Sequence, residues 1–182
     1  MNTNENAPRF TKVSLRTAAI IAGMGLLLMA ILSPIALLNT FPSLVKFDDA
    51  ALTAQNILNS MGAFRTAVLL LFVVALLDVV VAWGLYIVLM PANKNLSALA
   101  AWLRVIYAGI FIFAISKLFV AMQVLTTDGV QAMSFLKAFQ NIFDKGLILF
   151  GFHLLVLGYL AFKSGYVPKW LGTFLVLAGL GY

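Results

Sequence analysis

The chain has 182 residues, of which 63% are hydrophobic and only 10% are charged, and its mean hydropathy is +1.05. Soluble globular domains contain roughly 45–50% apolar and about 25% charged residues, so the composition excludes a soluble domain and, equally, intrinsic disorder. At about 20 residues for each spanning helix, the length suits four or five membrane spans. We therefore expect an all-α, polytopic transmembrane helix bundle.

The charge balance and the rare residue types limit which partners, metal sites and cofactors we expect. Lys and Arg number 12 against six Asp and Glu, for a net charge of +6. The basic residues stand singly between apolar runs, so we expect the lipid bilayer as the surroundings and no nucleic-acid partner. With no cysteine and one histidine, the sequence predicts no metal site and no cofactor.

The apolar runs predict the spans in chain order. Residues 1–16 form a polar, basic N-terminal tail, and residues 17–182 form one transmembrane domain. The first run has Pro34 near its outer end, and the second stops at Pro91, which cannot continue a helix. The four predicted full spans are Thr17 to Leu38, Phe64 to Met90, Leu96 to Leu125 and Gly146 to Phe162.

A fifth apolar run, from Trp170 to Tyr182, predicts only a partial span. As a helix, its 13 residues would measure about 20 Å, which is less than the roughly 30 Å of hydrocarbon. The run is either a half-span lying against its neighbours or the start of a longer helix in a truncated chain. We favour truncation.

The two outer connections predict short helices at the membrane interface. Between the first two spans, Ala50, Ala54 and Ile57 recur on one face with Thr53 opposite, and Asp48 is the predicted N-cap. Between the third and fourth spans, an apolar stripe contains Met133, Leu136, Phe139 and Phe143. We expect both segments to lie at the outer headgroup layer as anchors or as a cap.

The distribution of Lys and Arg predicts a cytoplasmic N-terminus. Six basic residues would then lie on the inner side and four on the outer side, which is the sense of the positive-inside rule. The inner residues are Arg9, Lys12, Arg16, Lys94, Lys163 and Lys169, and the outer residues are Lys46, Arg65, Lys137 and Lys145.

Ionisable residues inside the predicted spans are the candidate functional groups. Asp78 lies about 18 Å above the inner end of the second span, close to mid-membrane. A bare carboxylate there costs roughly 2.5–3.5 kcal/mol, so Asp78 must be paired, protonated or hydrated. Arg104 lies about 12 Å up the third span, and its long side chain either reaches Asp78 and holds it ionised or extends to the inner headgroups.

A histidine and a tyrosine extend this predicted cluster. His153 lies about 15 Å above Lys163 on the fourth span, at the level of Asp78. It either packs as a neutral imidazole bonded to a neighbouring helix or takes part in a proton relay or ligand site. Tyr107, Tyr86 and Tyr159 either complete the hydrogen bonds of the cluster or lie in interfacial belts. The predicted cluster is Asp78, Arg104, His153 and Tyr107.

The sequence also resembles a known family in a set of residues spread along the chain. These are Asp78, Leu85-Tyr86, Pro91, Arg104, His153, Gly158-Tyr159-Leu160, Lys163 to Pro168 and Ala178 to Tyr182. In them the chain is similar to the bacterial membrane proteins of the domain of unknown function family 4386. The resemblance implies about six spans and a bacterial plasma (inner) membrane. It implies no particular reaction.

Three functional hypotheses follow for this multi-pass protein. The first is a non-enzymatic membrane bundle that handles a small molecule or protons through the polar cluster. The second is a structural or interaction subunit of a membrane complex, in which the cluster fixes helix register. The third is an enzyme acting on lipids or quinones, which is disfavoured because the chain has no cysteine, no metal-ligand spacing and no GxSxG nucleophile motif.

Overall fold

The computed structural model describes residues 13–182, and within that range the chain folds entirely into helices and their connections. The predicted tail, residues 1–16, lies mostly outside the described residues. A first helix begins at Leu15, with Ser14 as its N-cap. The helices are α1 (Leu15–Pro34), η1 (Ile35–Thr40), α2 (Phe41–Leu44), α3 (Ala50–Asn59), α4 (Met61–Leu89), α5 (Lys94–Val124), α6 (Gly129–Ser164) and α7 (Lys169–Leu180).

Four long apolar helices confirm the predicted all-α bundle of spans. The segments α1, η1 and α2 are continuous and form one helix, so the four candidate spans are Leu15–Leu44, Met61–Leu89, Lys94–Val124 and Gly129–Ser164. Each is longer than the roughly 20 residues that a bilayer requires. The shorter α7, with 12 residues, corresponds to the predicted partial fifth span.

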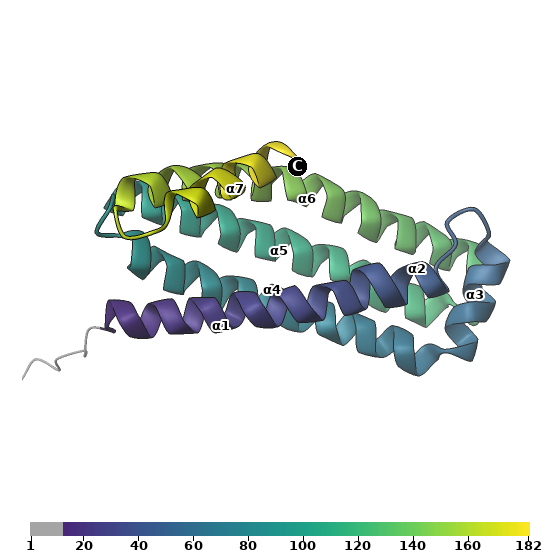
Figure 1. Ribbon diagram of the computed structural model, residues 1–182. Helices are drawn as coiled ribbons and strands as arrows, with labels where there is room; N and C mark the ends of the chain where they lie inside the picture. The colour runs from purple at the N-terminus through teal and green to yellow at the C-terminus, as the bar shows by residue number, and fades with distance from the viewer. Residues whose placement is uncertain (1–12) are drawn as a thin grey trace, which may run out of the picture.

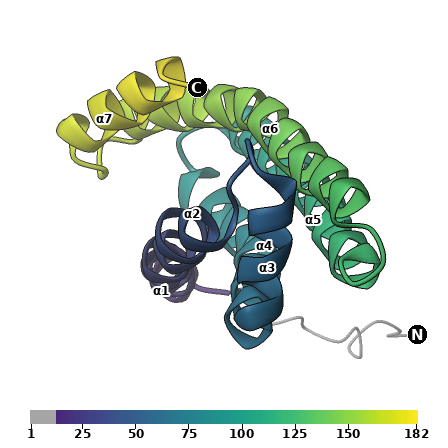
Figure 2. The same cartoon turned by 90° about the vertical axis from the view of Figure 1, so that its right-hand side faces the viewer.

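The helices form an open arc instead of a closed ring. Each helix packs against the next in the order α1, α4, α5, α6 and α7, as the view along the bundle shows (Figure 2). Within residues 13–182, α1 has no close backbone contact with α6 or α7. The arc therefore has a concave side, which α1, α4, α5 and α6 share.

The first span differs from its prediction at Pro34. The helix does not end near Leu38 but continues to Leu44 through a π-helical segment, η1. Proline removes one backbone donor from the helix, and the wider π turn accommodates the mismatch. The Thr40 hydroxyl donates to the Ile35 carbonyl oxygen at 2.9 Å, a hydrogen bond that joins the two ends of the π-helical segment.

Only one of the two predicted interfacial helices is a separate element. Helix α3 exists, but its N-cap is Asp49 and not Asp48, because the Asp49 carboxylate accepts from the Leu52 N–H at 2.9 Å. Thr53, predicted to lie opposite the apolar face of this helix, is buried instead and exchanges hydrogen bonds with the backbone of Lys46. These bonds tie the loop between α2 and α3 to the α3 helix.

The second predicted interfacial helix is the beginning of α6. The prediction of a separate element was wrong because nothing between Phe143 and Gly146 breaks the helix, which runs without interruption for 36 residues. Its apolar stripe, including Leu136 and Phe139, packs into the bundle core and not onto a headgroup layer. At about 54 Å, α6 is longer than the hydrocarbon layer and must tilt or project beyond it.

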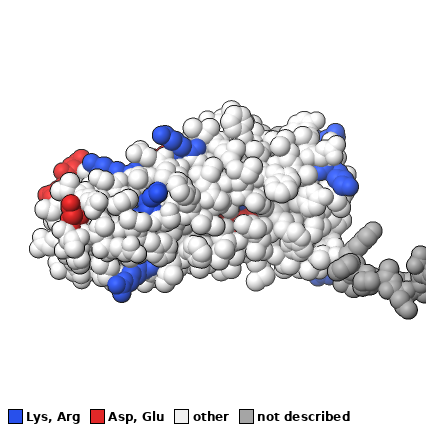
Figure 3. All heavy atoms as spheres, turned by 180° about the vertical axis from the view of Figure 1, so that it is seen from behind, with Lys and Arg blue, Asp and Glu red and all other residues white. Residues whose placement is uncertain are grey.

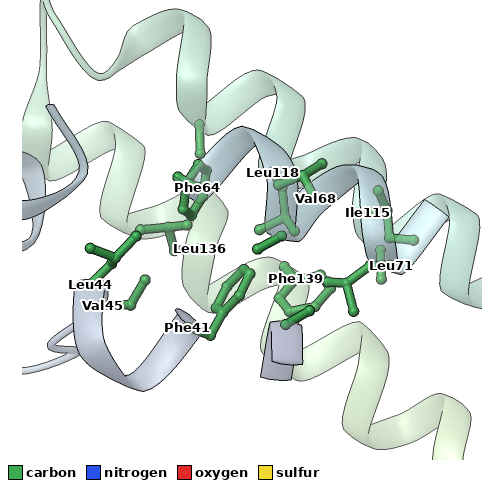
Figure 4. Close-up of a cluster of buried hydrophobic side chains, with 14 of the residues drawn as sticks. Phe41, Leu44, Val45, Phe64, Val68, Leu71, Ile115, Leu118, Leu136 and Phe139 are labelled. Atoms are coloured by element: carbon green, nitrogen blue, oxygen red, sulfur yellow. The ribbon is translucent and has the colours of Figure 1, made fainter. Parts of the chain in front are cut away.

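The packed apolar core lies at the end of the bundle that carries α2 and α3 (Figures 1 and 4). Phe41 of α2 packs between two tilted rings, with its centroid 5.6 Å from that of Phe64 and 5.4 Å from that of Phe139. The other core residues labelled in Figure 4 are Leu44, Val45, Val68, Leu71, Ile115, Leu118 and Leu136.

Helix α7 folds back along α6 through glycine contacts. Gly165, with φ of 75°, makes the turn. A Cβ added at Gly158 would lie 2.9 Å from the Gly172 carbonyl oxygen, and one added at Gly151 would lie 2.8 Å from that of Gly179. Only glycine permits backbones to approach this closely, so these positions fix where α7 lies.

Candidate functional site

The four residues of the predicted cluster come from three neighbouring helices and lie in the interior. Asp78 is on α4, Arg104 and Tyr107 are on α5, and His153 is on α6. Asp78, Arg104 and His153 expose only 1%, 2% and 1% of their surface, and Tyr107 exposes 7%. The structure therefore places all four away from lipid, at the middle of the arc.

Arg104 is the centre of the cluster. Its Nη2 lies 2.7 Å from Asp78 Oδ1, and its Nη1 lies 3.3 Å from His153 Nε2. The same Nη2 lies 3.8 Å from the Met29 sulfur on α1, and the guanidinium carbon lies 5.3 Å from the centroid of the Phe150 ring. One side chain thus contacts α1, α4 and α6 from α5, and it does not extend to the headgroups.

The hydrogen bonds of His153 define its tautomer. Its Nδ1 lies 2.8 Å from the Ala100 carbonyl oxygen, and a carbonyl only accepts, so Nδ1 carries the proton. Nε2 then accepts from Arg104 Nη1. A proton on Nε2 would direct two N–H groups at each other, so this geometry requires a neutral imidazole that holds the arginine in place.

The ion pair leaves hydrogen-bonding capacity unused. Asp78 Oδ1 lies 2.7 Å from Arg104 Nη2, so this oxygen is held in the ion pair. Arg104 Nε is buried and, among the described residues, has no hydrogen-bond partner. A carboxylate has about four acceptor sites on its two oxygens, and the contact with Arg104 occupies one of them, so Asp78 retains the capacity to accept from another molecule.

A cavity of about 220 Å³ lies beside the carboxylate on the concave side of the arc. The polar residues that line it are Asp78, Ser33, Tyr107 and Tyr182, and the apolar ones are Met29, Leu37, Val74, Phe111, Phe143, Leu147 and Phe150. Neither Arg104 nor His153 is among the lining residues, so the carboxylate is the charged group that this cavity presents.

Aromatic rings form much of the cavity wall. The ring of Tyr107 has its centroid 4.9 Å from that of Phe150 and 6.0 Å from that of Phe111. Phe143 packs against Phe111 at 5.2 Å, and Tyr182 meets Phe150 edge to face at 5.8 Å. Tyr107 thus joins the site through ring packing, and no hydrogen bond connects it to the other three residues of the predicted cluster.

The structure separates the remaining candidates from the cluster. Tyr159 is 52% exposed on α6. Tyr86 lines a groove on the opposite, outer side of α4 and α5. Lys117, a further charged residue of α5, lies over the Phe113 ring with its Nζ 4.4 Å from the ring centroid. Within residues 13–182, no group of three His, Asp or Glu residues could hold a metal ion.

Several site residues were missed from the sequence. Met29 and Ser33 of α1 and Phe150 of α6 are ordinary residues in apolar runs, and only their contacts reveal them. The neighbouring Pro34 is the one sequence signal near Ser33, since a proline inside a span predicts local backbone adjustment. Phe150 precedes His153 by three residues and so shares its helix face.

The four long apolar helices indicate a multi-pass helical membrane protein, and the buried polar cluster is its candidate site. A family model described as "Domain of unknown function (DUF4386)" matches residues 21–182. The chain therefore belongs to this family, and the resemblance seen in the sequence is confirmed.

One curated relative extends this comparison. The chain is similar to an "Uncharacterized protein" of Archaeoglobus fulgidus (strain ATCC 49558 / DSM 4304 / JCM 9628 / NBRC 100126 / VC-16), with 42% identity over 112 residues. The matched region covers 62% of this chain and 60% of that protein, so the chain spans about 60% of the length of the relative. No solved structure matches significantly.

Proposed function

We propose that this protein binds a small, largely apolar molecule that carries a hydrogen-bond donor, in the cavity beside Asp78. The observation that supports this proposal is the buried Asp78 carboxylate, which lines a cavity with mostly aromatic and aliphatic walls. Pockets for small molecules combine such walls with a few orienting polar groups. The protein would then act in binding or moving such a molecule within the membrane.

The size of the cavity sets the size of the ligand. An apolar cavity of about 150 Å³ accommodates benzene, so about 220 Å³ suits one ring with a short substituent. A neutral donor fits the electrostatics better than a cation, because Arg104 already compensates the charge of Asp78. A cation would leave a net charge in a medium of low dielectric constant.

Small-molecule binding is favoured over a proton relay. A relay needs a group that takes up and releases protons along a path. His153 uses both ring nitrogens, one on Ala100 and one on Arg104, and it does not line the cavity. The imidazole is therefore better suited to holding Arg104 than to passing a proton.

The test uses probes that differ in their donor group. Phenol and toluene have nearly the same shape, but only phenol donates a hydrogen bond, and benzylammonium adds a charge. A hydrogen bond to a charged acceptor contributes about 1.5–3 kcal/mol, so we expect phenol to bind roughly ten to a hundred times more tightly than toluene. Binding is measured by the shift of the thermal unfolding midpoint in detergent micelles.

Two variants separate the donor contact from general apolar binding. Asp78→Asn should remove most of the difference between phenol and toluene. Leu147→Trp, which fills the cavity from the α6 side, should weaken both probes while leaving the ion pair intact. Equal binding of phenol and toluene to the unmodified protein would contradict the proposal.

A second candidate function is a structural or interaction subunit of a membrane complex. It is favoured by Arg104, whose contacts with Asp78, His153 and Met29 connect four helices. In this case the cluster sets helix register, and a buried polar contact with such a role has precedents in helix bundles. Failure of all three probes to bind would favour this second candidate.

The proposed orientation has the N-terminus in the cytoplasm, in a plasma membrane. Support comes from the charges at the two ends of the bundle. Acidic side chains gather at the end that carries α2 and α3 (Figure 3). The opposite end carries Arg16, Lys94, Lys163 and Lys169 and, within residues 13–182, no acidic residue. Reporter fusions after Asn93 and after Asp128 should report the cytoplasmic and the outer side, respectively.

A further inference from the structure

A second hollow lies on the convex side of the arc, between α4 and α5. It has a volume of about 380 Å³, and its walls are almost entirely apolar. Ala82, Ala98 and Ala101 contribute small side chains to it, and Trp83 and Trp102 border it with 42% and 66% of their surface exposed. We call this hollow the tryptophan groove.

The tryptophan groove is separate from the Asp78 cavity. Val79 and Val105 line it, whereas Asp78 and Arg104, the residues just before them, are buried in the interior. Successive helix residues point in different directions, about 100° apart. The two sites share no lining residue, and occupying one does not require the other.

The dimensions of the groove favour a narrow occupant. On α4 it extends from Val79 to Tyr86, which is about 10 Å along the helix. A volume of about 380 Å³ over that length leaves a cross-section of under about 40 Å². A helix about 10 Å across has a cross-section of roughly 80 Å². A hydrocarbon chain fits inside the groove, whereas a helix would enter it only with its side chains.

A positive charge lies on α5 one helical turn beyond the Ala98 end of the groove. Lys94 precedes Ala98 by one helical turn and Ala101 by about two, so the three share one face of α5. Lys94 is exposed, and it lies about 6 Å further toward the end of the bundle than Ala98. Every charged residue described at that end is basic, which attracts anionic lipid headgroups.

We propose that the tryptophan groove binds one acyl chain of an anionic phospholipid, whose phosphate is held by Lys94. The apolar floor takes the chain, the two indoles cover it from either side, and the amine selects the negative headgroup. Amphipathic indoles are well suited to this depth, where the hydrocarbon layer meets the headgroups. This site is independent of the function proposed for Asp78.

The experiment uses the tryptophans as reporters. Trp170, the third tryptophan, lies outside the groove on α7, and Trp170→Phe removes its signal. The variant in detergent micelles is titrated with brominated phosphatidylglycerol or brominated phosphatidylcholine, because bromine on the acyl chain quenches nearby indole fluorescence. One lysine contributes about a fivefold preference for anionic lipid, so phosphatidylglycerol should quench at about fivefold lower concentration.

Matched variants assign the preference to this groove. Lys94→Gln should abolish the fivefold difference, whereas Lys163→Gln, at the same end of the bundle, should preserve it. Ala101→Leu should reduce quenching by both lipids, because it fills the floor. Asp78→Asn should change neither, which distinguishes failure here from failure at the cavity. Circular dichroism and monodispersity confirm that each variant is folded.

Three outcomes would overturn the proposal. One is equal quenching by the two lipids in the Trp170→Phe protein. Another is an equal loss of preference in the Lys94 and Lys163 variants, which would indicate a general surface charge effect. The third is a dimer, detected by light scattering, that Ala101→Leu dissociates, since the occupant would then be a second copy of this chain.

Discussion

The packed end of the bundle and its polar middle hold neighbouring helices together through different interactions. Under α2 and α3, Phe41, Phe64 and Phe139 fill the space between helices with rings and aliphatic side chains (Figure 4). At mid-bundle, Arg104 instead contacts three helices through polar and sulfur atoms, and a cavity remains beside it. The packed end provides contact energy, whereas the middle retains space and unused hydrogen-bonding capacity.

The difference reflects the solvent in which the helices pack. Inside a bilayer, apolar side chains gain little from leaving lipid, so helix association depends on close packing and on hydrogen bonds between helices. A cavity forgoes packing, and a buried ion pair incurs desolvation. A site that combines both is costly to stability, and such combinations are typical of functional sites.

The largest expected effect is at the polar middle. Arg104→Leu should destabilise the protein by about 3–5 kcal/mol, because it leaves the Asp78 carboxylate buried without its partner. The double variant Asp78→Leu with Arg104→Leu should recover most of that loss. Stability is measured by reversible unfolding in mixed detergent micelles. A double variant as unstable as Arg104→Leu alone would show that the pair stabilises the fold by more than mutual compensation.

At the packed end, a cavity created by substitution should destabilise the protein. Leu136 is fully buried, and Leu136→Ala should cost about 2 kcal/mol. This lies at the lower limit for such substitutions, because the unfolded side chain remains in an apolar medium and only packing is lost. Leu69, which is 58% exposed, is the matched control, and Leu69→Ala should change stability by less than about 0.5 kcal/mol. Equal effects would mean that this end is not tightly packed.

The packing of helix α7 also affects the cavity, since Tyr182 at the end of this helix lines the cavity wall. Gly158→Ala should destabilise by about 1–2 kcal/mol through overpacking against α7, and it should weaken phenol binding by displacing Tyr182. Gly109 on α5 has no atom within 4 Å of an added Cβ. Gly109→Ala should therefore be neutral or stabilising by up to about 1 kcal/mol. Identical unfolding curves for the two variants would argue against close glycine packing.

The smallest effect is expected outside both regions, at the turn before α7. The Tyr166 hydroxyl donates to the Val88 carbonyl oxygen at the end of α4, and burial raises the pKa of this phenol, which keeps it a donor. Tyr166→Phe should cost less than about 1 kcal/mol, because the side chain is half exposed. Unchanged phenol binding in this variant would show that the turn does not control the cavity.

Some features of the site could be predicted from the sequence because height along a helix depends only on residue count. Counting about 1.5 Å per residue placed Asp78, Arg104 and His153 at similar depth, and the structure brings all three together. The side of the helix on which each of these residues points inward could not be obtained by counting residues. The spans are apolar on every side, so the pattern contains no polar face to show which residues point inward.

The interfacial segments illustrate the same limit in another form. The stripe through Leu136 and Phe139 was recognised, but an apolar stripe fits an interfacial helix and a core helix equally well. Its continuation into α6 depends on the absence of a helix breaker and on the partner surface formed by α3, α4 and α5. Likewise, Asp48 and Asp49 are equivalent as N-caps in sequence, and only the backbone angles at Asp49 select it.

By itself, the sequence determined the membrane class, the four long spans and the presence of charged groups at mid-depth. Hydrophobic length and the cost of a charge in hydrocarbon are properties of the chain alone. The tertiary structure decided that Met29 and Phe150 complete the surroundings of Arg104, that α1 and α6 stay apart, and that the carboxylate faces a cavity. These features depend on how helix faces pack, which in apolar surroundings is set by shape and not by hydrophobicity.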